Sequence, residues 1–405
     1  MKQIKKNIIV VGAGPVGLLC ALQLAKNGIP VTVIEAEPEL TIDLRAGTFH
    51  PPTLEMLDSI GVTEAMMEIG IQVPRWQSRD LEEGLIVEWD MSVLANDTKY
   101  PFRLHLEQHR LTPILFKMLQ RYPHAEVLFS HPLLELNQSD DEVSLIIGNK
   151  AENLLFTGKW VIGADGGKSV VRKACDIEFD GYTWPERYSV MSTTFDLYPL
   201  GYADNAYMSD PIQWVAFFRM PDIGPPGLWR MTVPVDSSIS DEEVLTPHYA
   251  NQVFKRALNG QLQQDIPIVH QSVYRVHQRV AKQFRKHRVL LAGDSAHVNN
   301  PLGGFGLNSG IHDAMNLTEK LTRIINEDAN TELLDLYERQ RKSVNLKYVQ
   351  EFSINNKKQL EEKDPSIRQD RFAYLRKMNS NNVLRREYLL NSSMINSIQT
   401  ANLIS

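Results

Sequence analysis

The chain has 405 residues, of which 43% are hydrophobic, and a formal net charge of −6 at pH 7. This length and apolar content are sufficient for a large core, in two domains or in one elaborated domain. The net negative charge argues against a nucleic-acid partner, and the 2 cysteines provide no disulfide framework. No apolar stretch is long enough to span a bilayer, so we expect a cytoplasmic protein without a membrane segment.

The N-terminal segment has the pattern of a strand, a tight glycine turn, a helix and a second strand, within residues 8–35. Gly12, Gly14 and Gly17 have the spacing G-x-G-x-x-G. In this spacing the glycines allow the turn, the approach of a pyrophosphate and the close packing of the helix on the strand. Glu35 ends the second strand and can bind the hydroxyls of an adenosine ribose. Together these features predict a dinucleotide-binding site.

Two strand-rich regions, residues 71–106 and 178–278, interrupt this α/β pattern. Segments such as Trp214 to Phe218 and Leu228 to Pro234 alternate in polarity, which is typical of antiparallel strands with one buried face. We expect these regions to form a separate sheet above the nucleotide site. Their aromatic residues could line a pocket for a ring substrate, although core packing alone would explain most of them.

Residues 160–172 form a third nucleotide-like segment, in which a strand leads into a glycine-rich turn and a basic helix start. Asp165 stands at the turn. It could contact a bound nucleotide or simply cap the turn, and the two interpretations have equal support because Asp before Gly is common in turns.

The segment after the last predicted strand, which begins with Gly-Asp and continues into a glycine-rich loop, carries the most information. Asp294 should lie at the carboxyl end of that strand, where ligands of α/β folds bind, and could accept a hydrogen bond from a ribityl hydroxyl. Gly303 and Gly306 let the main chain approach a flat ring. Leu307 and Asn308 could offer backbone N–H groups at a helix N-terminus. Taken alone, the segment could also be a glycine-rich turn with a capping aspartate.

Three motifs occur in the order that is typical of one family. They are G-x-G-x-x-G at Gly12 to Gly17, D-G followed by S-x-x-R at Asp165 to Arg172, and G-D with A-H-x-x-x-P-x-x-G-x-G-x-N at Gly293 to Asn308. This triple resembles the class A flavoprotein monooxygenases, the aromatic hydroxylases of the p-hydroxybenzoate, phenol and 3-(3-hydroxyphenyl)propionate hydroxylase type. No second G-x-G-x-x-G is present, which agrees with class A enzymes, since they bind NADPH without a second Rossmann unit.

The resemblance implies an α/β fold with α+β elaboration: a Rossmann-like FAD-binding domain, an inserted antiparallel-sheet substrate domain and C-terminal helices. The implied divisions are residues 1–70, 107–177 and 279–345 for the FAD-binding domain, 71–106 and 178–278 for the substrate domain, and 346–405 for the C-terminal helical segment.

The resemblance also implies which residues bind FAD. Arg45 lies in a stretch similar to the family's arginine segment, although it could instead be a surface ion-pair partner. Gln108 lies in a stretch similar to a short flavin-contacting segment before a helix, and Asp165 would be near both FAD and a transient nicotinamide site. The implied FAD-binding residues are Gly12, Gly14, Pro15, Gly17, Glu35, Arg45, Gln108, Asp165, Asp294, Pro301, Gly303, Gly306, Leu307 and Asn308.

The activity implied by the resemblance is an FAD-dependent monooxygenase reaction. It would use NADH or NADPH and O₂ to hydroxylate a small aromatic or heteroaromatic substrate through a C4a-hydroperoxyflavin, with no metal. A phenolate reacts faster than a phenol, so a proton acceptor would help. His50, His105, Tyr188 and Tyr207 are candidates, and His50 is the predicted catalytic residue. A histidine at a helix start that is bonded to backbone groups is the alternative interpretation of His50.

Several points stay open at this level. The same flavin could oxygenate a larger polycyclic or quinolone-like substrate, or the chain could be a flavin-binding protein without oxygenase activity. Arg219 or Arg230 could bind a substrate carboxylate. The choices between NADH and NADPH, and between a monomer and a homodimer, are not determined by the sequence.

Overall fold

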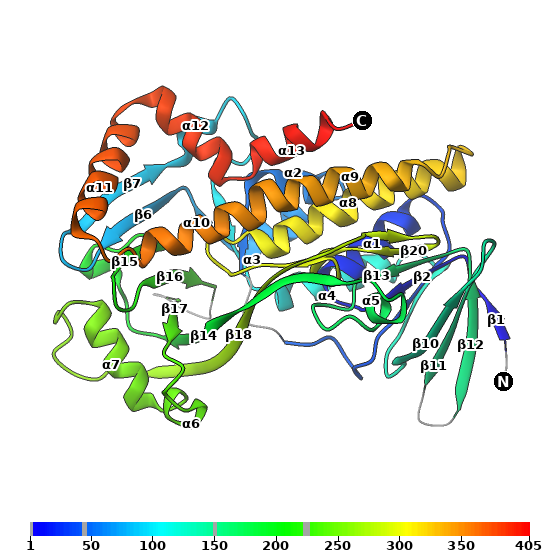
Figure 1. The fold of residues 1–405 in the computed structure, drawn as a ribbon, viewed down its shortest axis with the longest axis horizontal. Helices are drawn as coiled ribbons and strands as arrows, with labels where there is room; N and C mark the ends of the chain where they lie inside the picture. The colour runs from blue at the N-terminus through cyan, green and yellow to red at the C-terminus, as the bar shows by residue number, and fades with distance from the viewer. Residues whose placement is uncertain (1–2, 43–46, 149–151, 222–226) are drawn as a thin grey trace.

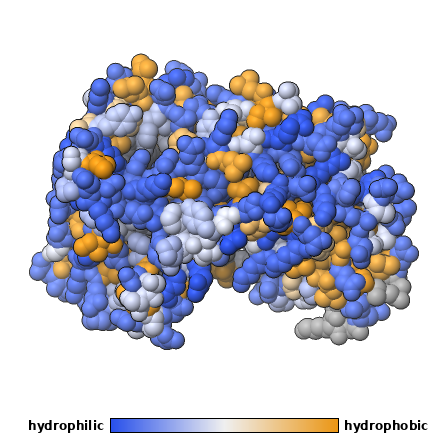
Figure 2. Space-filling view, viewed as in Figure 1, coloured by the Kyte–Doolittle hydropathy of each residue, from blue (hydrophilic) through white to orange (hydrophobic). Residues whose placement is uncertain are grey.

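The structure is a computed structural model that describes residues 3–42, 47–148, 152–221 and 227–405. Two large sheets lie side by side along the long axis, and a run of C-terminal helices crosses above both of them (Figure 1). Hydrophilic side chains dominate the face seen in this view, where apolar residues form small separate patches (Figure 2). None of the described helices combines the length and apolar character that a membrane span requires.

The first sheet contains the strands that the sequence predicts for the nucleotide-binding region. Its order is β19-β20-β13-β2-β3-β9, and every neighbouring pair is parallel except β19 and β20. The four central strands are buried along their whole length, which explains why they are continuous apolar runs. In sheet order the strands are Arg285–Lys286, Val289–Leu291, Trp160–Gly163, Ile8–Val11, Val31–Ile34 and Ala125–Leu128.

Three helices pack together on this sheet and direct their amino ends toward one region. α1 (Pro15–Lys26) contacts both α4 (Gln108–Leu119) and α8 (Phe305–Asn326), and apolar residues of all three belong to the main core. α1 follows β2 directly, with a proline at its start. The amino end of α1 therefore lies at the carboxyl ends of the parallel strands, the edge at which α/β folds bind ligands.

The second sheet has the order β21-β18-β14-β17-β16-β15-β6-β7 and is antiparallel except for the pair β15–β6. One face packs on α7 (Pro247–Ala257), which follows the short α6 (Asp241–Val244). The long strands β14 and β18 extend toward the first sheet and connect the two halves of the molecule (Figure 1). In sheet order the strands are His297–Val298, Ile268–Ala281, Phe179–Thr193, Leu228–Val235, Val215–Met220, Asn205–Ser209, Arg75–Asp80 and Gly84–Asp90.

Two smaller sheets complete the β-structure. β4 (Thr48–Phe49), β8 (Arg103–His105) and β5 (Ile71–Val73) form an antiparallel sheet of order β4-β8-β5. The other sheet has the order β1-β12-β11-β10, with strands Gln3–Lys5, Asn153–Gly158, Val143–Gly148 and Leu133–Gln138. Short helices accompany these sheets: α2 at Pro51–Asp58, α3 at Thr63–Ile69 and α5 at Val170–Ala174.

The C-terminal part is helical, as the sequence predicts. α9 (Leu333–Val344) packs along α8 and continues through a π-helical turn, Asn345–Gln350, into α10 (Glu351–Leu360). The combined helix passes from the first sheet to the second, where Lys357 forms an ion pair with Glu186 of β14 at 2.6 Å. The remaining helices are α11 (Pro365–Ser380), α12 (Asn382–Ser392) and α13 (Ile395–Asn402).

Candidate active site

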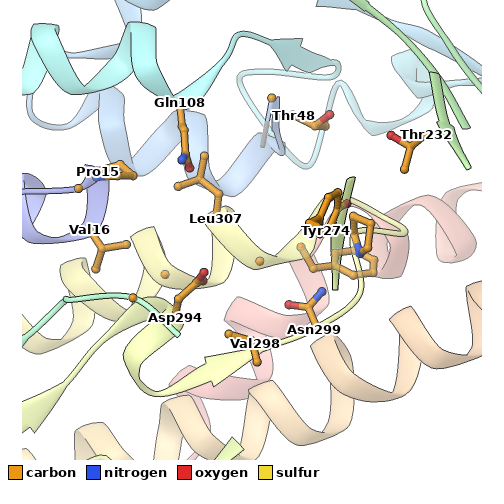
Figure 3. A pocket seen from close by; sticks show the side chains of 18 of the residues that line it. Pro15, Val16, Thr48, Gln108, Thr232, Tyr274, Asp294, Val298, Asn299 and Leu307 are labelled. Carbon is orange, nitrogen blue, oxygen red and sulfur yellow. The ribbon is translucent and has the colours of Figure 1, made fainter. Parts of the chain in front are cut away.

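A cavity of about 340 Å³ is lined by residues of both halves of the molecule. Its lining comes from the amino ends of α1, α4 and α8, from the segment after β20, and from β16, β17 and β18 of the second sheet. In Figure 3, the side chain of Gln108 extends from α4 toward Leu307 of α8. The predicted FAD-binding residues that line the cavity are Gly14, Pro15, Gln108, Asp294, Pro301, Gly306 and Leu307.

Two glycines of the turn before α1 have different surroundings: Gly17 packs against the backbone, and Gly14 faces open space. A Cβ on Gly17 would lie 2.0 Å from the carbonyl oxygen of Gly12, so the helix could not approach the strand with any other residue there. A Cβ on Gly14 would meet no protein atom within 4 Å. The carboxylate of Glu35 accepts a hydrogen bond from the backbone N–H of Ala13 at 2.6 Å. The turn thus has an acid on one side and free space at the amino end of a helix on the other.

The glycine-rich loop before α8 is bound to β4 by one side chain. The amide nitrogen of Asn308 donates to the carbonyl oxygens of Thr48 at 2.8 Å and Gly304 at 2.6 Å, and its oxygen accepts from the backbone N–H of His50 at 2.9 Å. The ring nitrogen Nε2 of His50 donates to the carbonyl oxygen of Gly303 at 2.8 Å. Asn308, which does not line the cavity itself, therefore holds together two segments that do.

His50, the predicted catalytic residue, is fully buried at the start of α2. Burial, followed by the nearby positive charge of Arg103, lowers the pKa of His50 to about 3. The ring is therefore neutral at physiological pH and bonded to a backbone carbonyl, as in the alternative interpretation of this residue. A proton-accepting role for His50 stays a prediction, to which its pKa gives little support.

Asp165 caps α5. Its carboxylate accepts hydrogen bonds from the hydroxyl of Ser169 at 2.6 Å and from the backbone N–H groups of Val170 at 2.7 Å and Val171 at 3.0 Å. Burial raises the pKa of Asp165. These are contacts of a helix start, and the adjacent Gly166 lines the cavity; a contact of Asp165 with the cofactor stays a prediction.

A buried ionic cluster supports the Gly-Asp segment from the side away from the cavity. Asp313 of α8 accepts from the backbone N–H of Gly293 at 3.0 Å, from Nε2 of His297 at 2.6 Å and from Nε of Arg341 at 2.7 Å. Burial alone would raise the pKa of Asp313, but His297 and Arg341 lower it to about 2. Asp313 and Arg341 could not be predicted, because nothing in the local sequence relates two residues of different helices.

The wall formed by the second sheet has an aromatic and a charged part. Phe218 and Arg230 are cross-strand partners and line the cavity with Thr232 and Tyr274. Arg230 donates through Nη2 to Oε1 of Glu107 at 3.1 Å, and both side chains are buried. The sequence analysis named Arg230 but missed Glu107, which is far away in the sequence.

The other predicted residues are distributed around this site. Arg45 lies outside the described residues. Arg219 contacts the hydroxyl of Tyr198 and does not line the cavity. Among the candidate proton acceptors, burial lowers the pKa of His105 to about 3 and raises that of Tyr188.

Comparisons with known proteins agree with this geometry. Residues 5–352 match the family model described as FAD binding domain. Para-nitrophenol 4-monooxygenase of Pseudomonas sp. (strain WBC-3) is 35% identical over 391 residues, which cover 96% of either chain. The 6-hydroxy-3-succinoylpyridine 3-monooxygenase HspB of Pseudomonas putida (strain DSM 28022 / S16) is 34% identical over 362 residues, 89% of this chain and 90% of that protein. The crystal structure of p-nitrophenol 4-monooxygenase PnpA from Pseudomonas putida DLL-E4 is similar with a TM-score of 0.92, at 34% identity and 99% coverage of both chains.

Proposed function

Because the chain belongs to the FAD-binding family of flavin-dependent aromatic monooxygenases, we propose that it uses NADH or NADPH and O₂ to oxygenate a small phenol or hydroxypyridine. The names of two relatives give the position of oxygenation as carbon 4 of para-nitrophenol and carbon 3 of a 6-hydroxypyridine. Both positions are para to the hydroxyl group and carry a substituent. The proposed reaction of this chain is therefore oxygenation at the ring carbon para to a hydroxyl, where the new C–O bond replaces the bond to the substituent. With para-nitrophenol the nitro group would leave as nitrite with the bonding electrons, which gives para-benzoquinone.

The observation that carries this proposal is that one cavity is lined by all three cofactor motifs and by the second sheet. Bound FAD would take electrons from the nicotinamide and pass them to O₂. Gly14 leaves space beside the amino end of α1 for a pyrophosphate. Asp294 lines the cavity farther along, where it can accept from the ribityl chain.

The amino end of α8 is the proposed site of the flavin ring. Gly306 and Leu307 lie in the first turn of this helix, where backbone N–H groups lack a partner within the helix, and both line the cavity. These groups can stabilise negative charge on the reduced ring. Gln108 approaches from α4, and Pro301 lines the cavity before α8.

The other predicted residues are proposed to act indirectly. Those that do not line the cavity shape the segments that do: Gly12, Gly17, Glu35, Asp165, Gly303 and Asn308. The role of Arg45 stays a prediction. We also propose the predicted domain division. It is supported because every strand of the first sheet falls within one predicted domain and most strands of the second sheet fall within the other. β21 is an exception, because it pairs with β18 across the proposed boundary.

The size and chemistry of the cavity favour a single-ring substrate over a polycyclic one. Its volume of about 340 Å³ must also accommodate the flavin ring. Phe218, Met220 and Tyr274 of the second sheet line the cavity and can exclude water from the reaction. Exclusion of water is what a hydroxylase needs to couple electron transfer to oxygenation.

The proposal is tested with purified, FAD-loaded protein and a matched pair of substrates. We expect para-nitrophenol to accelerate NADH or NADPH oxidation and to be consumed in proportion, with little hydrogen peroxide released. The isomer meta-nitrophenol, which has no substituent para to its hydroxyl, should be a poorer substrate. If no phenol or hydroxypyridine accelerates oxidation with either nicotinamide, the proposed activity is wrong, and a flavin-binding protein without oxygenase activity becomes the better description.

A further inference from the structure

One part of the cavity lining, residues 298–301, is held from behind by side-chain amides, and we call it the lining segment. All of it except Asn300, which is completely buried, lines the cavity. The backbone N–H of Asn300 donates to Oε1 of Gln278 at 3.0 Å, and its side-chain nitrogen donates to the same atom at 3.2 Å. The carbonyl oxygen of Val298 accepts from Nε2 of Gln350 at 3.2 Å. Side chains outside the cavity lining therefore fix the main chain of this segment.

Gln278 is the centre of this arrangement, and its buried amide uses its oxygen and its nitrogen. Oε1 also accepts from the indole N–H of Trp184 at 3.3 Å, and Nε2 donates to Oε1 of Gln350 at 2.7 Å and to Oγ of Ser353 at 3.0 Å. The direction of the amide is fixed, because backbone and indole N–H groups can only donate. The amide of Gln350 is then fixed as well, since its oxygen accepts from Gln278 and its nitrogen faces the carbonyl of Val298. A change at Gln278 thus reaches both anchored points of the lining segment.

Two of the groups bonded to Gln278 come from irregular parts of regular elements. Gln350 ends the π-helical turn, and its Nε2 also donates to Oδ1 of Asn345, the first residue of that turn, at 3.2 Å. A π-helix bonds residue i to residue i+5, which brings the first and last residues of the turn to one side. Trp184 lies in a bulge of β14, where the register with β18 shifts. Irregularities of both kinds redirect side chains and are frequent beside functional sites, and here both direct a polar group at Gln278.

Gln278 also belongs to the strand that forms another part of the cavity wall. Side chains alternate along a strand, so Gln278 lies on the same face of β18 as Tyr274, which lines the cavity (Figure 3). The burial pattern agrees, because Val276 and Gln278 are buried while Arg275 and His277 between them are exposed. One side chain of the second sheet therefore holds the lining segment at a set distance from the wall that this sheet provides.

We propose that Gln278 and Gln350 form a clamp that sets the spacing between the second-sheet wall and the lining segment, and that this spacing determines how completely nicotinamide oxidation is coupled to oxygenation. The inference rests on the proposed function, and both amides are positioning residues within it. A loosened lining segment would misplace the ring substrate and admit water. The hydride of the nicotinamide and a proton from the solvent would then convert O₂ into hydrogen peroxide, and the substrate would stay unchanged.

The first test compares two glutamines of β18. Gln278→Met retains the length of the side chain and removes its hydrogen bonds. We expect this variant to bind FAD at least about tenfold more weakly, because buried polar groups lose their partner. The visible circular dichroism of its bound flavin should differ from that of the native protein, and at saturating FAD a larger share of the oxidised nicotinamide should appear as peroxide.

Gln271→Met is the matched control. Gln271 lies on the same strand, but its amide donates to the carbonyl oxygens of Val244 and Thr246, beside α6 and α7. This variant should unfold at a lower temperature than the native protein and keep the native FAD affinity, flavin spectrum and peroxide share. Native values of all three in Gln278→Met would overturn the inference, and so would equal changes in the two variants.

Hydrogen exchange in FAD-loaded protein reports on the clamp itself. The backbone N–H of Asn300 should exchange at least about tenfold faster in Gln278→Met than in the native protein, and at the native rate in Gln271→Met. If Gln278→Met does not fold, Gln350→Met removes the bond to Val298 from the helix side. That variant must then show the weaker FAD binding and the larger peroxide share, and native values in it would equally overturn the inference.

The outcomes separate this inference from the function on which it rests. If the native protein oxygenates a phenol and Gln278→Met releases no more peroxide than the native protein, the proposed function stands and the clamp has no part in coupling. If the native protein binds FAD but oxygenates no phenol or hydroxypyridine, the proposed function fails and the coupling role fails with it. The FAD affinities and the exchange of Asn300 still decide in that case whether the clamp holds the lining segment.

Discussion

Replacing Asp313 by Asn is expected to be among the most destabilising single changes near the site. Asp313 and Arg341 are both almost completely buried, and the carboxylate forms an ion pair with that guanidinium at 2.7 Å. The substitution retains the shape of the side chain but removes its charge, which leaves a cation without its counter-ion in the core. Removing one partner of a buried pair typically costs about 3–5 kcal/mol.

The same interaction lowers the pKa of Asp313. A pKa of about 2, against the ordinary value of 3.8 for Asp, corresponds to about 2–3 kcal/mol of favourable interaction with the ionised form. Since the pKa is lowered on folding, this contribution is complete above pH 4 and is lost as the pH falls toward 2. Below pH 4 the free energy of unfolding should therefore fall less steeply with decreasing pH in Asp313→Asn than in the native protein.

The assay is urea denaturation of native protein and variant, with and without FAD. Asp335→Asn is the control, because Asp335 forms an exposed ion pair with Arg285, whose loss should cost less than about 1 kcal/mol. We also expect weaker FAD binding in Asp313→Asn, since Asp313 holds the backbone of Gly293 next to the cavity. If the free energy of unfolding of Asp313→Asn lies within about 1 kcal/mol of that of Asp335→Asn, this account of the ionic cluster is refuted.

Three further substitutions test other parts of the site. In Gly17→Ala the new Cβ would lie 2.0 Å from a carbonyl oxygen, so α1 could not pack on the glycine turn that precedes it. We expect an unstable protein without FAD, which thermal unfolding and flavin content will show. Gly14→Ala should fold normally without FAD but bind FAD at least about tenfold more weakly, because its methyl group enters the space proposed for the pyrophosphate. An unchanged affinity for FAD in a titration would argue against a phosphate at this position. His50→Ala should lower stability by about 1–2 kcal/mol through the lost bond to Gly303, with an unchanged pH profile of turnover. A profile that loses one ionisation would restore the role of His50 as a base.

The family and the fold class were predicted correctly from the sequence, and the reason is local. The G-x-G-x-x-G turn, the strands around it and Glu35 form one continuous segment, so their spacing alone determines their geometry. The late motif is similar, because its strand, loop and helix follow one another directly. Gly306 and Leu307 accordingly line the cavity that the prediction required.

The parts that could not be predicted depend on contacts between distant segments. Glu107 and Arg230 come from the start of α4 and from β17, and their pairing depends on how the two sheets pack. Thr232 and Tyr274 line the cavity because of the register of β17 and β18, which a local pattern of alternation does not provide. The hydrogen bonds of Asp165 to the backbone of Val170 and Val171 likewise depend on how the turn folds back on its own carboxylate.

The central claim, that this chain inserts one oxygen atom into a ring bound beside FAD, is tested most directly with isotopically labelled O₂. Purified protein is loaded with FAD and supplied with NADH or NADPH and para-nitrophenol, and the product is examined by mass spectrometry. The account predicts incorporation of one labelled oxygen atom per molecule of product, with O₂ consumption matching product formation. Oxidation of the nicotinamide that yields only peroxide and an unlabelled ring across phenols and hydroxypyridines would contradict it.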